Sequence, residues 1–450
     1  MFDYAWRYPR PSGIQRVQHE LFHALAQLPE AAGRIGFVRH ASTQNALRGV
    51  AYPAVAALFD ERDAPPRQPP RRIATPAAAE RTGDGTGDGP LRRLAYRVPP
   101  RLREPLLQLY VNQRASLGAL AALARAARPA PRPPPAARAA EDAFAREAAP
   151  GDVLAVLGAA WTHPDYARVL LGARRRGLRV ALLVHDLIPV FRPEWCDRGL
   201  VARFGAWIES VLPLAERVFT VSAATAADLR RYAAMRGVAL PEPLRILPPG
   251  TGFTTAPAGL PRAPRLPPAG SYVLSVGTVS AHKNQALLFR VWRRLLDELP
   301  VDAVPHLVLA GRTGALVADL MQQLHNTRFL DGRVVMIEDP TDAELAQLYE
   351  GCRFTVFASL YEGWGLPVTE SLRFGVPCIA ANATALPEAG GALARYFDPD
   401  CATDAVRVIR AAIEEADGLA GWRRQIAEEF RPVSWTAAAQ ALLTAINAEV

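Results

Sequence analysis

A lysine beside a run of small residues is the first group in the sequence whose surroundings suggest chemistry. Lys283 lies in the segment 277–284 and is the only lysine among the 450 residues. An apolar run at 272–276 precedes this segment, and a helical pattern follows it. Backbone amides of a small-residue loop can approach a phosphate, and a helix N-terminus favours an anion. Because almost every other cation of the chain is arginine, a single lysine at this turn indicates a point charge that binds a diphosphate. The alternative is a lysine that is simply exposed to solvent.

Two glutamates follow a second apolar run, residues 354–358. Glu362 and Glu370 are separated by a stretch in which Gly363 and Gly365 permit unusual backbone angles and a proline fits the start of a helix. This predicts Glu370 in the first turn of that helix and Glu362 in the loop before it. One carboxylate could hold ribose hydroxyls and the other a sugar hydroxyl. For Glu370, complementing the helix dipole is the alternative.

The two stretches resemble retaining, sugar-nucleotide-dependent glycosyltransferases of the GT-B fold with a Glu-x7-Glu motif, the family 4-type or "group 1" transferases. The resemblance covers residues 271–399 and rests on 277–284, 307–312 and 362–370. It implies that Lys283 binds the donor diphosphate, Glu370 the ribose and Glu362 the donor sugar, with Lys283 and Glu362 as catalytic residues. The further donor-binding residues that it implies are Gly277, Thr278, Asn284, Gly311, Arg312, Gly363, Gly365 and Leu366.

Three residues earlier in the chain extend the resemblance more faintly. Segment 11–17 is similar to the glycine loop and following helix of the same family, which implies that Gly13 and Arg16 face the donor phosphates or the acceptor. His185 follows the apolar run 180–184 and resembles a histidine that contacts the donor sugar near the reacting carbon, so it is a third catalytic candidate. A structural loop and a structural histidine are the alternatives. His282 stands where many relatives carry arginine, so an extra cation beside Lys283 would be absent or pH-dependent.

Regular alternation of short apolar runs with helical patterns must position these residues. The expected strands are 34–39, 153–157, 180–184, 218–221, 244–247, 272–276, 306–310, 334–337, 354–358 and 378–381. A short run at 2–6 would be a first strand. Such alternation predicts α/β architecture, here two Rossmann-like, doubly wound parallel-sheet domains facing a cleft, as in GT-B. Ligands are then expected beyond the carboxyl ends of the strands.

Proline-rich segments divide the chain. We predict an N-terminal, acceptor-side domain at 1–265 with a Pro/Arg-rich insertion at about 62–140, and a sugar-nucleotide-binding domain at 270–425. A C-terminal helix within 426–450 is expected to pack back on the N-terminal domain.

The amino-acid composition of the chain argues against several classes of function. The net charge of +8 comes almost entirely from arginine, and no zinc-finger spacing or aromatic-rich RNA motif accompanies it, so specific nucleic-acid binding is not expected. Four scattered cysteines fit a reducing compartment, and neither a leader nor an apolar run of roughly 18 residues is evident. We expect a cytoplasmic protein, with peripheral contact at the inner face of the cell membrane as an option. No metal site or cofactor is expected, since no carboxylate pair with Mg²⁺ spacing is evident.

Together these features predict transfer of a hexose from a nucleoside diphosphate sugar, GDP-mannose or a UDP-hexose, with retention of configuration. The resemblance implies a glycan or lipid-linked acceptor and bacterial surface polysaccharide synthesis. Two alternatives stay open: a nucleotide-sugar epimerase of the same fold, and a non-catalytic basic binding protein on an inactive transferase fold.

Overall fold

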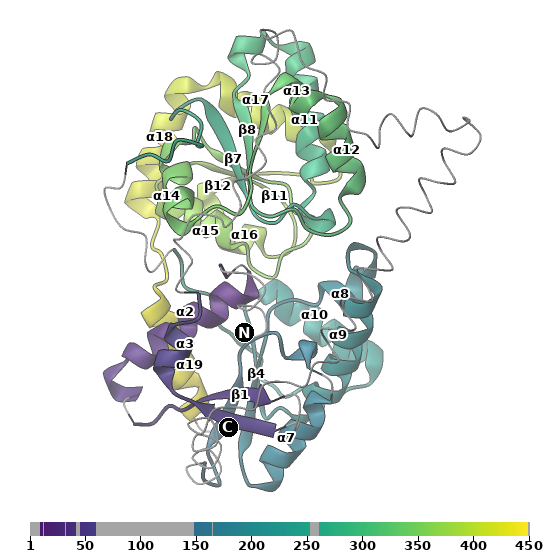
Figure 1. Ribbon diagram of the computed structural model, residues 1–450, viewed down its shortest axis with the longest axis vertical. Coiled ribbons are helices and arrows are strands. Elements are labelled where there is room, and N and C mark those ends of the chain that lie inside the picture. Colours follow the sequence, from purple (N-terminus) through teal and green to yellow (C-terminus); the bar gives the residue numbers. More distant parts are fainter. Residues whose placement is uncertain are drawn as a thin grey trace, which may run out of the picture. The chain divides into compact units, whose positions relative to one another are not determined.

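The computed structural model describes residues 10–11, 13–31, 33–41, 46–59, 148–163, 165–252 and 261–448. They all belong to one compact unit formed by residues 1–70 and 140–450. The described residues form two parallel sheets and one antiparallel hairpin (Figure 1). The predicted insertion at about 62–140 and the predicted strand at 2–6 lie outside the described residues.

The first parallel sheet has the strand order β3-β4-β5-β6. Its strands are β3 (Val153–Val156), β4 (Arg179–Val184), β5 (Arg217–Thr220) and β6 (Arg245–Ile246). The helices that follow β3, β4 and β5 are α7 (Tyr166–Arg175), the pair α8 (Ile188–Phe191) and α9 (Arg198–Val211), and α10 (Ala223–Arg236). The four strands differ from the predicted ones only at their ends. Continuous burial along β4 and β5 explains why their sequences lack a polar alternation.

The second parallel sheet has the order β12-β11-β10-β7-β8-β9. Its strands are β7 (Tyr272–Val276), β8 (His306–Ala310), β9 (Val334–Ile337), β10 (Thr355–Phe357), β11 (Cys378–Ala381) and β12 (Ala394–Phe397). Its helices are α11 (Gln285–Glu298), α12 (Ala318–Asn326), α13 (Arg328–Asp331), α14 (Asp342–Gly351), α15 (Leu366–Arg373), α16 (Leu386–Gly390), α17 (Ala402–Glu414) and α18 (Ala416–Glu429). The predicted α/β class with two parallel sheets is therefore confirmed. The edge strand β12 was not predicted, because Arg395 and Tyr396 interrupt its apolar pattern.

Strand order reverses between β7 and β10, which lie side by side through the pairing of Leu274 with Thr355. From β7 the chain proceeds to β8 and β9, whereas β11 and β12 lie beyond β10 on the other side. The loops that leave β7 and β10 therefore diverge and open a crevice at the carboxyl end of the sheet. Loop 277–284 and loop 359–365, which carry the predicted donor residues, flank this crevice.

The N-terminal segment adds α2 (Ile14–Gln27), the hairpin of β1 (Phe37–Ala41) and β2 (Ala46–Val50), and α3 (Tyr52–Ala56). The strand predicted at 34–39 forms as β1, shifted toward its C-terminal end, and its partner β2 was not predicted. The last helix, α19 (Trp435–Asn447), lies beside α2 (Figure 1). Val17, Leu21 and Leu25 of α2 share one buried cluster with Ala438 and Leu442 of α19.

Candidate active site

A cavity of about 480 Å³ lies where the crevice of the second sheet meets the strand ends of the first. Thirteen of the fourteen predicted site residues line it: Gly13, Arg16, His185, Gly277, Thr278, Lys283, Gly311, Arg312, Glu362, Gly363, Gly365, Leu366 and Glu370. Asn284 is the exception, because its side-chain amide donates to the Pro399 carbonyl at 3.3 Å, away from the cavity. These positions are structural findings, and the roles of the residues in binding or catalysis stay predictions.

Two glycines bring the loops after β7 and β8 into direct backbone contact. Gly277 and Gly311 have φ angles of 139° and 155°. A Cβ atom on Gly311 would lie 2.2 Å from the Gly277 carbonyl oxygen, so only glycine fits there. The Val279 amide donates to the Arg312 carbonyl at 2.8 Å and continues this pairing. Main-chain atoms therefore form this wall of the cavity, where a ligand can approach the backbone closely.

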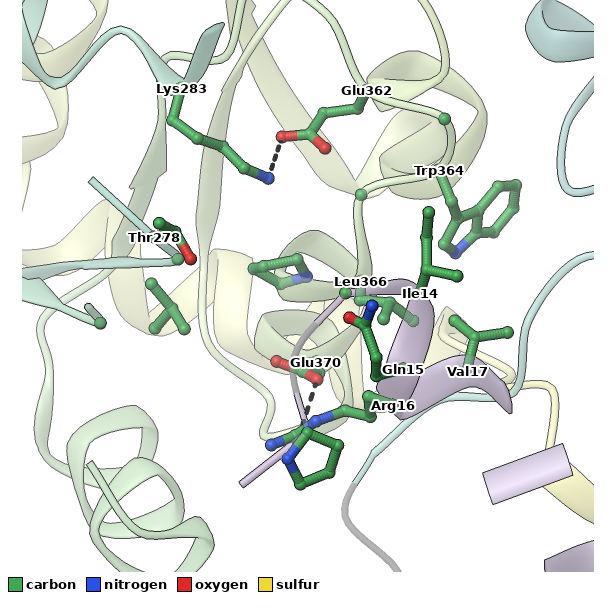
Figure 2. Close-up of a pocket in the computed structure, with 18 of the residues that line it drawn as sticks. Ile14, Gln15, Arg16, Val17, Thr278, Lys283, Glu362, Trp364, Leu366 and Glu370 are labelled. Atoms are coloured by element: carbon green, nitrogen blue, oxygen red, sulfur yellow. Dashed lines mark hydrogen bonds and ion pairs between the residues drawn. The ribbon is translucent and has the colours of Figure 1, made fainter. Parts of the chain in front are cut away.

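Lys283 and Glu362 form an ion pair across the crevice. Lys283 Nζ lies 2.5 Å from Glu362 Oε1, with side-chain exposures of 20% and 14% (Figure 2). Burial is the largest influence and by itself would raise the pKa of Glu362, but the charge and hydrogen bond of Lys283, with smaller contributions from His282 and Ser359, together hold that pKa below its usual value. The backbone of Glu362 is fixed by Thr384, whose hydroxyl accepts from the Glu362 amide and donates to its carbonyl, both at 2.9 Å. The pair is thus charged and held in place.

His282 does not add a second cation at neutral pH. Burial, followed by the charge of Lys283, lowers the pKa of His282 to about 4. Its carbonyl accepts a hydrogen bond from the Leu360 amide at 2.8 Å, which ties the loop after β7 to the loop after β10. Next to Lys283 the chain therefore carries a neutral imidazole.

Glu370 lies beyond the first turn of α15, not within it as predicted, because Gly365 adopts a φ of 113° and caps a helix that begins at Leu366. The carboxylate is buried and accepts a hydrogen bond from the Tyr349 hydroxyl at 2.8 Å. Arg16 Nη1 lies 3.9 Å from its other oxygen. Burial raises the pKa of Glu370 in spite of Arg16. Side chains, not the helix dipole, are the partners of this carboxylate.

Arg16 lines the cavity, yet its guanidinium is directed at carboxylates. Its Nη2 atom lies 2.6 Å from Asp342 Oδ1, in a pair that is almost fully buried. Figure 2 shows the same guanidinium reaching toward Glu370. A phosphate-binding role for Arg16 would require these contacts to change. Sequence reasoning missed both Asp342 and Tyr349, although a Thr-Asp pair before a helical pattern is a readable start signal for α14.

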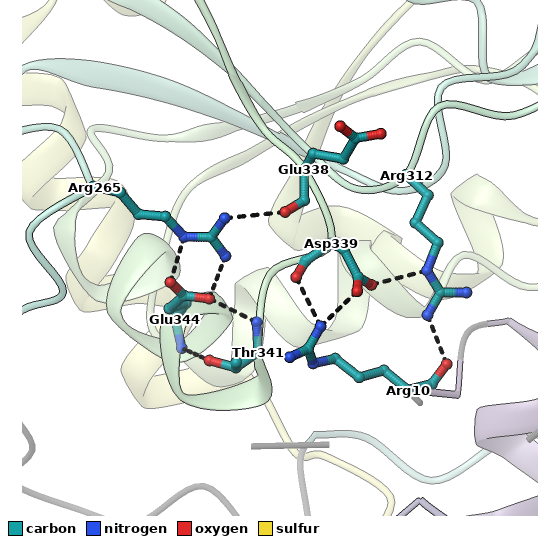
Figure 3. A network of polar contacts seen from close by, with 7 residues as sticks. All are labelled: Arg10, Arg265, Arg312, Glu338, Asp339, Thr341 and Glu344. Atoms are coloured by element: carbon teal, nitrogen blue, oxygen red, sulfur yellow. Dashed lines mark hydrogen bonds and ion pairs between the residues drawn. The ribbon is translucent and has the colours of Figure 1, made fainter. Parts of the chain in front are cut away.

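Arg312 belongs to a polar network at another wall (Figure 3). Arg10 Nη1 lies 2.6 Å from one carboxylate oxygen of Asp339, and Arg312 Nε lies 2.9 Å from the other. Arg312 also donates to the Arg10 carbonyl at 2.7 Å. Beside it, Arg265 holds Glu344 through two contacts of 2.5 Å each. Arg10 and Asp339 were not predicted, since no local pattern distinguishes them from other surface charges.

His185 directly follows β4, and its ring is buried. Its Nε2 atom lies 3.0 Å from the Leu157 carbonyl oxygen, and burial lowers the pKa of His185 to about 4. The neighbouring Asp186 accepts from the Ile188 amide at 3.1 Å, and burial raises its pKa to about 6. A Cβ atom on Gly363 would lie 2.0 Å from the His185 carbonyl oxygen. His185 and the loop of Glu362 are therefore packed backbone to backbone.

No group of three or more His, Cys, Asp or Glu side chains in the described ranges could hold a metal ion. Within the same ranges, no helix is both long and apolar enough to cross a membrane.

The fold and the cavity together place this chain in a class of proteins, the α/β proteins that have a ligand-sized cavity at the carboxyl ends of their parallel strands. Residues 260–428 match the family model of glycosyl transferases group 1, and this segment belongs to that family.

Similar proteins were found among both sequences and solved structures. "Serotype-specific mannosyltransferase WbdA" of Escherichia coli is 28% identical over 265 residues, which are 56% of this chain and 31% of that protein. "O-antigen chain mannosyltransferase B" of Escherichia coli is 33% identical over 129 residues, 29% of this chain and 33% of that protein. The chain thus spans about a third of the length of these relatives. The solved structure of Anabaena Alr3699/HepE in complex with UDP and glucose has a TM-score of 0.49 at 16% identity, over 66% of this chain and 77% of that one.

Proposed function

We propose that this chain is a retaining glycosyltransferase that moves a hexose from a nucleoside diphosphate sugar to a glycan or lipid-linked acceptor. The acceptor hydroxyl oxygen would bond to the anomeric carbon as the bond from that carbon to the diphosphate oxygen breaks, with retention of configuration, and the hydroxyl proton would leave with the nucleoside diphosphate. The observation that carries the proposal is the Lys283–Glu362 pair at the point where strand order reverses, in a cavity walled by close-packed glycine loops. Such a site suits a ligand with a phosphate end and a hydroxyl-rich end.

Each end of the proposed donor has chemical partners. Lys283 supplies a point charge for the diphosphate and would stabilise the negative charge that develops as the glycosidic bond breaks. Glu362 can accept hydrogen bonds from sugar hydroxyls, and Glu370 from ribose hydroxyls. Because a lysine and main-chain amides can neutralise the leaving group, we propose transfer without a metal ion or other cofactor. Unchanged turnover after chelation with EDTA is the expected result.

The relatives make mannose the first sugar to test. The names of the two Escherichia coli relatives include mannosyltransferase activity, and one refers to the O-antigen chain. We therefore propose GDP-mannose as the leading donor and a UDP-hexose as the second. Bacterial surface polysaccharide synthesis, in the cytoplasm or at the inner face of the membrane, is the setting that we propose.

The test begins with binding and ends with turnover. GDP-mannose, UDP-glucose and UDP-galactose are compared for thermal stabilisation of the chain, and the donors that bind are then offered glycan and lipid-linked acceptors. We expect one donor to stabilise the chain and to yield a product whose anomeric configuration matches the donor by NMR. Lys283→Ala and Glu370→Ala should lose transfer while keeping the circular dichroism spectrum of the fold.

Other results would replace the proposal. Conversion of the donor into an isomeric nucleotide sugar without any acceptor would identify an epimerase. Salt-sensitive binding to DNA or RNA, with no affinity for a sugar nucleotide, would identify a binding protein on an inactive fold. Near-normal turnover by Lys283→Ala would remove the site assignment.

A further inference from the structure

A carboxylate on a helix of the second sheet accepts hydrogen bonds from the first turn of α10. Glu388, on α16, accepts from the Ala223 amide at 2.7 Å with one oxygen and from the Ala224 amide at 2.7 Å with the other. The first amides of a helix have no partner within it, and the helix dipole favours a negative charge there. The Ser222 hydroxyl accepts from the Thr225 amide at 3.0 Å. Glu388 and Ser222 together satisfy the amide donors of this turn.

The same turn touches the loop that carries Glu362. Thr225 Oγ1 is buried and lies 3.3 Å from both the His185 carbonyl oxygen and the Gly363 carbonyl oxygen. One turn further along α10, Asp228 is hydrogen-bonded to the Tyr361 hydroxyl. Residues 361 and 363 flank Glu362, so α10 contacts this loop on both sides of the predicted catalytic glutamate.

These contacts join elements of the two parallel sheets that lie far apart in the sequence. His185 and α10 follow strands β4 and β5 of the first sheet, whereas the loop and α16 follow β10 and β11 of the second. None of Glu388, Thr225 and Asp228 lines the cavity. The Glu388 contact is solvent-exposed, and such charge-assisted hydrogen bonds can break and re-form more readily than buried ones. Docking of α10 therefore sets how the Glu362 loop lies against His185, without touching the cavity.

We propose that Glu388 and Thr225 are positioning residues for the proposed transfer, which dock α10 against the loop of Glu362 and so place that loop against His185. This inference rests on the proposed function. Lys283 and Glu370, the predicted partners of the diphosphate and the ribose, lie on the second sheet's side and make no contact with α10, so loosening α10 should leave most of the donor affinity intact. Turnover depends on the arrangement of residues from both sheets, and small displacements of these residues lower the reaction rate strongly.

Two independent variants remove the docking contacts. Glu388→Gln keeps the size of the side chain but loses the charge and one of the two acceptor oxygens. Thr225→Val keeps the volume but loses the hydroxyl, and Thr225→Ser restores it. Glu414→Gln is the matched control, since Glu414 is an exposed glutamate of α17 whose contact is to Arg410 on its own helix.

Three readouts separate positioning from general damage: donor affinity by calorimetry, kcat, and hydrogen exchange of the peptide spanning residues 222–229. For Glu388→Gln we expect exchange at the Ala223 and Ala224 amides to rise about 10-fold and kcat to fall about 10- to 100-fold, with donor Kd within about twofold of wild type. Thr225→Val should show the same split between kcat and Kd, and Thr225→Ser should recover most of kcat. Glu414→Gln should match wild type throughout.

Wild-type kcat in Glu388→Gln and Thr225→Val would overturn the inference while leaving the proposed function standing. A parallel loss of donor affinity in both variants would also overturn it, because the contacts would then support the donor site itself. If the wild-type chain neither binds nor turns over a sugar nucleotide, the proposed function fails and the inference falls with it.

Discussion

Lys283 and Glu362 lie 79 positions apart in the chain, yet their charged atoms approach to 2.5 Å. They meet because β7 and β10 are neighbours in the sheet and the chain leaves them in opposite directions. Each residue follows its strand within one short loop, so the reversal of strand order places the pair at the mouth of the crevice. The ion pair is therefore a direct consequence of sheet topology.

Breaking this pair from one side should cost stability as well as function. Lys283→Met leaves the Glu362 carboxylate buried without its main cation, so we expect the pKa of Glu362 to rise and the free energy of unfolding at pH 7 to fall by about 1–3 kcal/mol. Adding Glu362→Gln should recover part of that loss, because no unpaired charge then remains. Urea denaturation of the two single variants and the double variant gives the coupling energy.

An exposed pair provides the comparison. Arg230 and Glu242 are 2.9 Å apart with side-chain exposures of 52% and 47%, so water screens this pair and Arg230→Met should change the stability little. A Lys283→Met variant that loses no more stability than Arg230→Met would contradict the account of a buried, coupled pair.

His185 should make the fold sensitive to mild acid. Burial lowers its pKa from 6.5 to about 4, so between these values the unfolded chain binds a proton that the folded chain does not. The stabilising contribution is complete above pH 6.5 and is lost as the pH falls through about 4. Replacing His185 by Gln should flatten the dependence of the unfolding free energy on pH in that window. His282 contributes in the same direction and stays in place in this variant.

The measurement is denaturant unfolding of wild type and His185→Gln at several pH values from 7 down to about 4.5. An NMR titration of the His185 ring supplies the direct check. A ring that titrates near 6.5 in the folded protein, or equal slopes for the two proteins, would contradict the burial argument.

The strands were predictable wherever the sheet buries them completely. The run at 378–381 is apolar throughout and the run at 272–276 is interrupted only by Ser275, and both form strands with those bounds. The missed strands lack this signal: β12 contains Arg395 and Tyr396, and β2 belongs to the β1–β2 ribbon outside both parallel sheets. Local pattern therefore predicted the interior strands and the edge strands β3, β6 and β9, but missed β12 and β2.

Candidate site residues were predictable where they follow a strand and a glycine-rich turn, as Lys283 and Glu362 do. Their charged neighbours Asp342 and Asp339 were not predictable. Asp342 lies at a helix start and Asp339 in a loop, and no spacing rule connects them to Arg16 or Arg10. The acidic partner of a buried arginine is decided by tertiary packing, on which a single sequence carries no local signal.

Gly363 should tolerate no side chain. A Cβ atom there would lie 2.0 Å from the His185 carbonyl oxygen, so Gly363→Ala forces the loop of Glu362 away from β4. We expect a loss of about 1–3 kcal/mol in stability and a larger loss of turnover than of fold. Gly205→Ala is the control, since Gly205 lies within α9 with no atom near its Cβ position. That change should be neutral or stabilising by about 0.5–1 kcal/mol. Equal stability of the two variants would argue against close packing at residue 363.

Arg16 should matter more to stability than any exposed arginine. It lies between the carboxylates of Asp342 and Glu370, which come from α14 and α15, while Arg16 itself comes from α2. Arg16→Met leaves two buried carboxylates near each other, and breaking buried pairs typically costs about 3–5 kcal/mol. We expect the unfolding free energy at pH 7 to fall by that order, with a partial recovery when Asp342→Asn is added.

Arg16→Lys should recover little, because a compact ammonium cannot reproduce the planar guanidinium that reaches both carboxylates. Since the Arg16–Asp342 pair is buried, raising the salt concentration should change the stability loss of Arg16→Met only slightly. At the exposed Arg236–Glu209 pair, higher salt should further reduce the already small stability loss of Arg236→Met. Denaturant titrations at low and high salt separate the two cases. If the cost of Arg16→Met disappeared in high salt, the contact would be a screened surface pair, and Arg16 would be free to serve the ligand instead.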